Sequence, residues 1–270
     1  MDVPVVLHSG DATVMVHPTA GGRIGQIEVA GQRLLVDVPT TNAHPMSWGS
    51  FPMAPWVGRI RTGRFEFGGD QHQLDLNHED GDGGAARSHS IHGTVFSRAW
   101  TIDEQSDTAI SMSCRLAGAL DWPFGGNARQ HIDLGADRLR CDLLVEADHG
   151  RFPAEIGWHP WFRKPDRVDF APTAMYRRDE FGLPTGELVE PSDGPWDDCF
   201  INVDDVRLTY DRAVAPTVTV AADCDHWVIF DEPTAATCVE PQSGPPDAFN
   251  LRAHVVTPSS PLRRTMTIAW

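Results

Sequence analysis

Basic residues are scarce in this 270-residue chain, and no long apolar run interrupts it. Lysine and arginine total 22 against 38 aspartates and glutamates, which gives a formal net charge of −16. Binding to nucleic acid or to an anionic membrane requires clustered cations, so this balance disfavours both as general partners. The first residues carry no basic segment followed by an apolar one, so we expect no secretory signal and a cytoplasmic location.

Cysteines are also few, and their arrangement excludes several kinds of site. The five cysteines are odd in number and form no Cys-x-x-Cys pair, which argues against a disulfide framework and a structural zinc site. The sequence lacks the glycine-rich phosphate loop, the dinucleotide fingerprint after a strand, the His-Glu-x-x-His motif and the Gly-x-Ser-x-Gly elbow. Nucleotide-dependent, zinc-protease and serine-hydrolase chemistry are therefore not expected.

Short runs of alternating apolar and polar residues are abundant instead. Such alternation occurs at 110–116, 139–145, 206–210 and 266–270, while 21 prolines and 24 glycines divide the chain. Period-two patterns between turn residues predict an all-β fold of packed antiparallel sheets with few short helices. We also predict strands within 12–36, a hairpin over 64–76, and loops at 78–89 and 184–198. No stretch has the composition of an interdomain linker, so one domain over 1–270 is expected.

Four short segments, far apart in the chain, carry the residues most suited to chemistry. They are Pro55–Ile60 with Arg59, Ser90–Gly93 with His92, Gly157–Phe162 with His159, and Val239–Gln242 with Glu240. A carboxylate base, an imidazole acid and a polar clamp beside indole rings are what acid–base chemistry on a sugar requires. Taken singly, each residue also has an ordinary interpretation: a surface glutamate at a strand end, a buried structural histidine, or an arginine in an ion pair.

Together these segments resemble the aldose 1-epimerase (galactose mutarotase) family over about residues 20 to 268. Val57-Gly58-Arg59-Ile60, Ile91-His92-Gly93 and Trp158-His159-Pro160-Trp161-Phe162 are similar to family motifs in order and spacing. Asp197 ahead of Phe200 matches a family aspartate before an aromatic residue, and Glu240-Pro241-Gln242 precedes the matching Pro246-Asp247-Ala248. The resemblance implies a large antiparallel β-supersandwich that interconverts the anomers of a hexose without a cofactor or metal.

The resemblance also implies a role for each site residue. Glu240 would be the general base at the C1 hydroxyl, and His159 the general acid at the ring oxygen. Arg59, His92 and Asp197 would bind the sugar, and we place Trp158 and Gln242 among the substrate-binding residues as well. A small-molecule sugar is the expected partner, and the protein is expected to be a monomer or homodimer.

Three alternatives stay open at this stage. Arg163 and Lys164 follow the His159 motif, and they either face solvent or bind a phosphate or sulfonate at C6, which would make the substrate an anionic hexose. Glu240 and Asp197 would suit a glycoside hydrolase if their carboxyl groups flanked a glycosidic bond. A non-catalytic carbohydrate-binding domain would instead use tryptophans as a platform: Trp56, Trp158 and Trp161.

Overall fold

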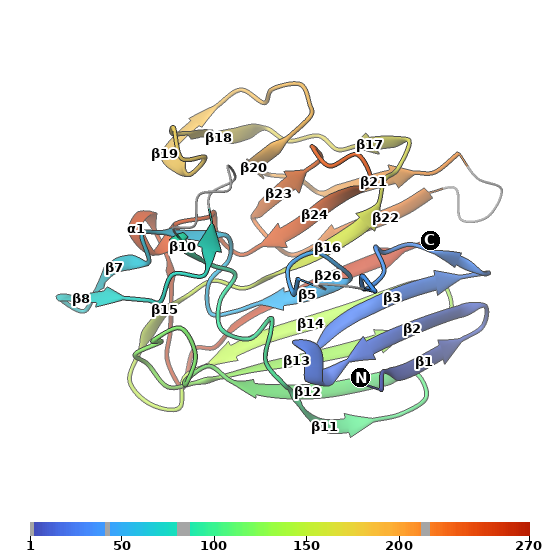
Figure 1. Cartoon of the computed structure of the whole chain (residues 1–270), viewed down its shortest axis with the longest axis horizontal. Coiled ribbons are helices and arrows are strands. Elements are labelled where there is room, and N and C mark those ends of the chain that lie inside the picture. Colours follow the sequence, from blue (N-terminus) through green and yellow to red (C-terminus); the bar gives the residue numbers. More distant parts are fainter. Residues whose placement is uncertain (1–2, 41–43, 80–86, 212–216) are drawn as a thin grey trace.

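The computed structural model describes residues 3–40, 44–79, 87–211 and 217–270, and the regular secondary structure in these ranges consists almost entirely of antiparallel strands (Figure 1). Helical structure within them is limited to η1 (Pro18–Ala20) and α1 (Ala248–Leu251). The predicted all-β fold with few short helices is therefore confirmed. None of the described helices has the length and apolar character needed to cross a bilayer.

The first of the two large sheets carries the segments with the candidate site residues. Within the described ranges it has 11 strands, with β4 (Gln32–Arg33) attached to the side of β3. The order along the main path is β1 (Val5–Ser9), β2 (Ala12–His17), β3 (Arg23–Val29), β5 (Ser50–Met53), β16 (Gly157–Arg163), β24 (Ala236–Gln242), β23 (His226–Phe230), β20 (Asp197–Ile201), β18 (Ala174–Arg178) and β19 (Pro184–Val189).

The second large sheet forms the opposing layer. Its 8 described strands run in the order β11 (Thr101–Gln105), β12 (Ala109–Arg115), β13 (Asn127–Leu134), β14 (Arg138–Glu146), β26 (Leu262–Ala269), β22 (Thr217–Ala222), β21 (Asp205–Thr209) and β17 (Arg167–Asp169). Smaller sheets complete the described part of the fold: β6 (Arg59–Arg61) with β10 (Arg87–Ile91) and β9 (His78–Glu79), β15 (Phe152–Ala154) with β25 (His254–Val256), and the hairpin β7 (Arg64–Phe67) with β8 (Asp70–Gln73).

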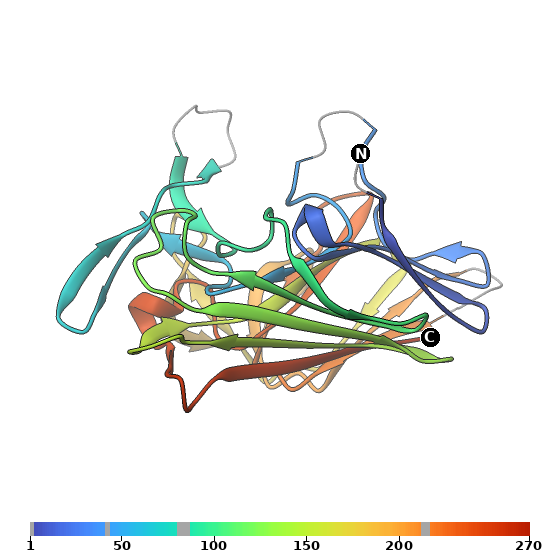
Figure 2. The same ribbon diagram turned by 90° about the horizontal axis from the view of Figure 1, so that it is seen from below.

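The core lies between the two layers. Figure 2 shows them from below, with the green strands of the second sheet beneath the blue strands of the first. In β12, β13 and β14 every second residue is buried, as the alternation in the sequence predicts. Each methylene removed from water contributes about 0.8 kcal/mol, so the inward-facing rows of both sheets supply the main driving force for folding.

Two predicted loops differ from the structure. The 184–198 segment begins with an edge strand, β19, which pairs with β18, because a proline is tolerated at the first position of an edge strand. The 78–89 segment begins and ends in short strands, and its residues 80–86 lie outside the described part of the chain. The predicted 64–76 hairpin is confirmed as β7 and β8.

A close backbone approach fixes the turn that carries His92. His92 and Gly93 both have positive φ angles, 62° and 80°, a region that costs a residue with a side chain roughly 1–2 kcal/mol. A Cβ added to Gly93 would lie 2.0 Å from the carbonyl oxygen of Ala54. Only glycine fits here, so the turn is held against Ala54 by packing of backbone on backbone.

Gly93→Ala should therefore destabilise the protein more than Gly69→Ala. Gly69 also has a positive φ, 92°, but a Cβ there meets no atom within 4 Å. Both variants carry the strain of the left-handed region, and Gly93→Ala adds an overpacking cost of about 1–3 kcal/mol. Urea unfolding of the two variants measures the difference, and equal losses would contradict the close approach at Ala54.

Candidate active site

The site is built on one row of residues that crosses the first sheet. Cα pairing aligns His159 with Phe51 on β5, Glu240 with Val228 on β23, and Val228 in turn with Cys199 on β20. β16 and β24 are neighbouring strands, and their register pairs Gly157 with Gln242 and Trp161 with Cys238. This register places His159 opposite Glu240. Strand pairing thus brings residues 81 positions apart together.

Two prolines interrupt the ladder at the same point. Pro160 in β16 and Pro241 in β24 have no backbone N–H to donate, and no Cα pairing joins residues 158–160 of β16 to residues 239–241 of β24. Proline is rare in the middle of a sheet for this reason. The interruption falls where His159 and Glu240 face each other.

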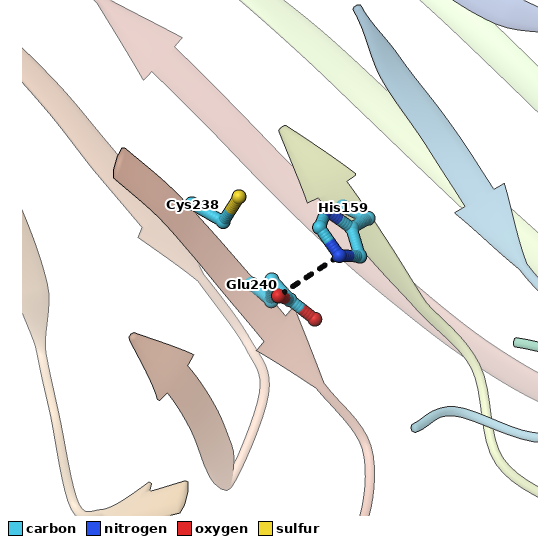
Figure 3. Close-up of side chains that lie close together, drawn as sticks. All are labelled: His159, Cys238 and Glu240. Atoms are coloured by element: carbon cyan, nitrogen blue, oxygen red, sulfur yellow. Dashed lines mark ion pairs between the residues drawn. The ribbon is translucent and has the colours of Figure 1, made fainter. Parts of the chain in front are cut away.

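His159 and Glu240 contact each other directly and are almost inaccessible to solvent. The distance from His159 Nε2 to Glu240 Oε1 is 3.1 Å (Figure 3), and the two residues are 5% and 3% exposed. Gln242, the next residue on the same face of β24, donates from its Nε2 to Glu240 Oε2 at 3.0 Å. The carboxylate is thereby fixed at both oxygens.

Aromatic rings fix the orientation of the imidazole. Phe51 and Trp161 both stack on His159, with centroid distances of 4.7 and 5.3 Å. The ring of His92 meets it edge-on at 5.0 Å. A ring held on its faces and at its edge has little freedom to rotate, so its Nε2 stays directed at Glu240.

Burial shifts the protonation of both partners. Desolvation raises the pKa of Glu240 well above its ordinary value, against the smaller opposing effects of Gln242 and Arg59. Desolvation also lowers the pKa of His159 to about 3 and that of His92 well below its ordinary range. These directions favour a protonated carboxyl beside a neutral imidazole over an ion pair, although both states hold the same number of protons.

Two arginines and two aspartates form a polar wall beside the pair. Arg59 Nη2 lies 3.7 Å from Asp197 Oδ2 and its Nη1 donates to the carbonyl of Phe181. Arg178 donates through Nη1 to the Asp197 carbonyl oxygen at 2.6 Å and to Oδ2 at 3.1 Å. Arg178 Nε lies 3.0 Å from Asp198 Oδ1. Each positive charge therefore faces a negative one, and the wall is rich in directed donors and acceptors.

The His159–Glu240 pair and the two arginines and two aspartates of the polar wall line one cavity of about 670 Å³. The structure brings together around this cavity six of the seven residues singled out from the sequence: Glu240, His159, Arg59, His92, Asp197 and Gln242. Trp161, Tyr176, Arg178 and Asp198 also line it. A cavity of this size with convergent polar groups has the form of a small-molecule site.

Trp158 requires a correction. It is fully buried, it does not line the cavity, and its indole N–H donates to Gln130 Oε1 at 3.2 Å. Successive side chains of a strand point to opposite faces, so His159 and Trp161 face the cavity while Trp158 faces the core. Trp56 is likewise 1% exposed in the core, which leaves Trp161 as the one member of the proposed tryptophan platform that lines the cavity.

Arg163 and Lys164 do not line the cavity either. Arg163 pairs with Asp37 and donates to the carbonyl of Leu35, and Lys164 Nζ lies 2.7 Å from Asp231 Oδ1. Arg61, on the strand of Arg59, pairs with Asp179 and Asp247. These cations are therefore engaged in ion pairs away from the cavity.

Arg178 is the main cavity residue that the sequence did not indicate. It stands in Tyr176-Arg177-Arg178, where adjacent arginines look alike, and only the alternation of β18 separates them. Arg177 pairs with Glu187 on the exposed side, and Arg178 turns inward to Asp197. Among the described residues one group has the geometry to hold a metal ion, namely His159, Cys238 and Glu240.

The described part of the chain thus combines a two-layered antiparallel fold with a buried carboxylate–imidazole pair in a polar cavity. The family model for aldose 1-epimerase matches residues 4–247, so the chain belongs to the aldose 1-epimerase family.

Known proteins resemble the chain, in sequence or in structure, at low sequence identity. The uncharacterized protein YihR of Escherichia coli K12 is 23% identical over 91% of this chain and 85% of its own length. The crystal structure of galactose 1-epimerase from Lactobacillus acidophilus superimposes with a TM-score of 0.80 at 16% identity, covering 98% and 93% of the two chains. A GalM/aldose epimerase homologue from C. elegans has a TM-score of 0.82 at 12% identity, covering 100% and 98%.

The raised pKa of Glu240 predicts how Glu240→Gln changes the stability of the protein with pH. The folded pKa of Glu240 is raised, so above about pH 4.5 the unfolded chain releases a proton that the folded chain retains. Glu240 therefore destabilises the fold increasingly as pH rises. Glu240→Gln should gain stability relative to the parent between pH 4.5 and 8, by up to about 1.36 kcal/mol per pH unit.

Urea unfolding at several pH values measures this difference. Glu66→Gln, on the exposed hairpin strand β7, serves as the control and should show little pH-dependent difference. A difference for Glu240→Gln that does not change between pH 4.5 and 8 would show that the carboxyl ionises normally.

Proposed function

We propose that the protein is an aldose 1-epimerase that interconverts the α and β anomers of a neutral hexose, with Glu240 and His159 as base and acid. The observation that carries this proposal is the direct contact between His159 Nε2 and Glu240 Oε1, 3.1 Å apart in a polar cavity. Family membership supports the same reaction class, isomerisation of a sugar.

The chemistry needs one proton acceptor and one proton donor at two oxygens bonded to the same carbon. Glu240 takes the proton of the C1 hydroxyl as the C1–O5 bond breaks, and His159 gives its proton to O5. The aldehyde then rotates about C1–C2, and the reverse steps close the other anomer. Ring opening thus converts the ion pair into protonated Glu240 and neutral His159, the state that burial favours.

This relation between burial and chemistry has a kinetic consequence. Ring opening discharges the pair, so desolvation favours the protonation state that ring opening produces, while the reactive ion pair has to form first in the substrate-bound site. The hydrogen bond from Gln242 and the charge of Arg59 lower the pKa of Glu240 against the effect of burial, which favours the ionised carboxylate that acts as base. Each positioned acid or base contributes about 10²–10⁴-fold to such reactions.

The surroundings of Glu240 favour this reaction over the alternatives. A glycoside hydrolase needs two carboxyl groups across a glycosidic bond, whereas the group in contact with Glu240 is an imidazole. A binding module has no use for a buried acid–base pair, whose desolvation costs stability.

The charges in the cavity favour a neutral sugar over an anionic one. Arg59 faces Asp197, and Arg178 faces Asp197 and Asp198. Arg163 and Lys164, which suggested a C6 anion, pair with Asp37 and Asp231 outside the cavity. Among the described residues that line the cavity, both arginines are thus matched by carboxylates, which leaves no excess positive charge for a phosphate or sulfonate.

Glu240→Gln should lower the enzymatic rate of anomer exchange by about 10²–10⁴-fold, because the amide cannot accept the hydroxyl proton. Freshly dissolved α-glucose and α-galactose are followed by polarimetry and by NMR, with Glu66→Gln as the control. Circular dichroism establishes that the variant is folded. Parent-like rates in folded Glu240→Gln would remove Glu240 from the role of base.

Arg178→Gln should raise KM for a neutral hexose about tenfold with a smaller change in kcat. Arg178 fixes Asp197 through two hydrogen bonds, and a hydrogen bond to a charged group contributes about 1.5–3 kcal/mol. Arg177→Gln, which breaks only the exposed pair with Glu187, is the matched control. Faster turnover of a 6-phosphorylated hexose than of glucose or galactose, lost in Arg178→Gln, would contradict the neutral substrate.

A further inference from the structure

Cys238 has no part in the proposed reaction, yet its thiol lies with the catalytic pair. It stands two residues before Glu240 on β24, so both side chains project from the same face of the strand. Figure 3 shows Cys238 and Glu240 on one strand and His159 on its neighbour. One ligand atom from each residue, a sulfur, an oxygen and a nitrogen, lies within 4.8 Å of the others.

This donor set matches the coordination preferences of zinc. Zn²⁺ binds thiolate, imidazole and carboxylate at about 2.0–2.3 Å in tetrahedral geometry, which puts neighbouring ligand atoms about 3.3–3.6 Å apart. His159 Nε2 and Glu240 Oε1 are already 3.1 Å apart. From the 4.8 Å limit of the group, the thiol needs to approach by at most about 1.5 Å to reach this spacing.

Charge and access also fit a divalent cation. A thiolate, a carboxylate and a neutral imidazole carry two negative charges, so Zn²⁺ makes the buried cluster neutral and avoids the cost of a buried net charge. His159 and Glu240 line the cavity, which gives the ion a path from solvent. Mg²⁺ and Ca²⁺ prefer oxygen ligands, so a site with sulfur and nitrogen donors discriminates against them.

We propose that Cys238, His159 and Glu240 form an inhibitory binding site for Zn²⁺ at the part of the cavity wall that His159 and Glu240 line. Zinc occupies the lone pairs of His159 Nε2 and of the Glu240 carboxylate, so neither group is free to transfer a proton. Binding displaces two protons into solvent, the thiol proton and the one held by the His159–Glu240 pair, and the fourth coordination position takes water. The inhibitory effect rests on the proposed epimerase activity, whereas the metal site itself does not.

The first test is binding of Zn²⁺ alone and of Co²⁺ as its spectroscopic substitute. The parent protein should bind one ion per chain in calorimetry, and Co²⁺ should give a thiolate-to-metal charge-transfer band in the near ultraviolet. Cys238→Ser should lose the band and bind at least about tenfold more weakly, since even loss of an outer-shell partner costs about 10–100-fold. Cys238→Ala is the second variant, and circular dichroism selects a folded one.

Cys141→Ala provides the matched control, because Cys141 is a fully buried thiol on β14 in the other sheet. It should bind both ions like the parent. Absence of one-to-one binding in the parent, or an unchanged Co²⁺ band in folded Cys238→Ser, would overturn the site whether or not the protein is an epimerase.

The second test is anomer exchange in the presence of zinc. Micromolar Zn²⁺ should inhibit the parent and Cys141→Ala reversibly, with full recovery after a chelator, while Cys238→Ser keeps parent-like activity and resists zinc at least about tenfold better. Equal zinc sensitivity of the parent and Cys238→Ser, or no inhibition of a parent that binds zinc at Cys238, would overturn the inhibitory role.

Discussion

The contact between the buried carboxyl of Glu240 and the imidazole of His159 is the constraint on which the rest of the site depends. Both side chains are almost fully removed from water, and an ionised pair in such a place costs several kcal/mol per charge unless its geometry compensates. The stacked rings of Phe51 and Trp161, the hydrogen bond from Gln242 and the charge of Arg59 supply that geometry. Burial nevertheless favours a protonated carboxyl beside a neutral imidazole, the state that the proposed ring opening produces.

The sheet turns this local requirement into a property of the fold. Neighbouring strands β16 and β24 bring the two residues opposite each other, and the pairing between these two strands is interrupted at that position, where Pro160 and Pro241 stand. Residues on the same face of β24 then line up as Cys238, Glu240 and Gln242. The alternation of β24 therefore places Glu240, its hydrogen-bonding amide and the thiol of the proposed zinc site on one face, opposite His159 of β16.

Much of the fold could be predicted from the sequence because alternation is a local signal. The rows at 110–116 and 139–145 are strands of the second sheet, and the glycines at 68 and 69 mark the hairpin. β24 was harder, because all seven of its residues are buried and no alternation of polarity marks its faces. The strand at 184–189 was missed because a leading proline is as common in loops as at strand edges.

The candidate site was predictable in its residue types and less so in its geometry. His159 and Glu240 stand out because each precedes a proline in an unusual aromatic or proline-rich segment, but their contact depends on the register between distant strands. The same register decides that Trp161 faces the cavity and Trp158 the core, and that Arg178 turns inward beside Arg177. Such distinctions require the pairing of strands far apart in sequence.

A crystal structure with glucose or galactose bound tests the central claim most directly. The account predicts the C1 hydroxyl within hydrogen-bonding distance of the Glu240 carboxylate and the ring oxygen within hydrogen-bonding distance of His159 Nε2. A sugar bound with C1 directed away from both residues, with His159 Nε2 still in contact with Glu240 Oε1, would contradict it.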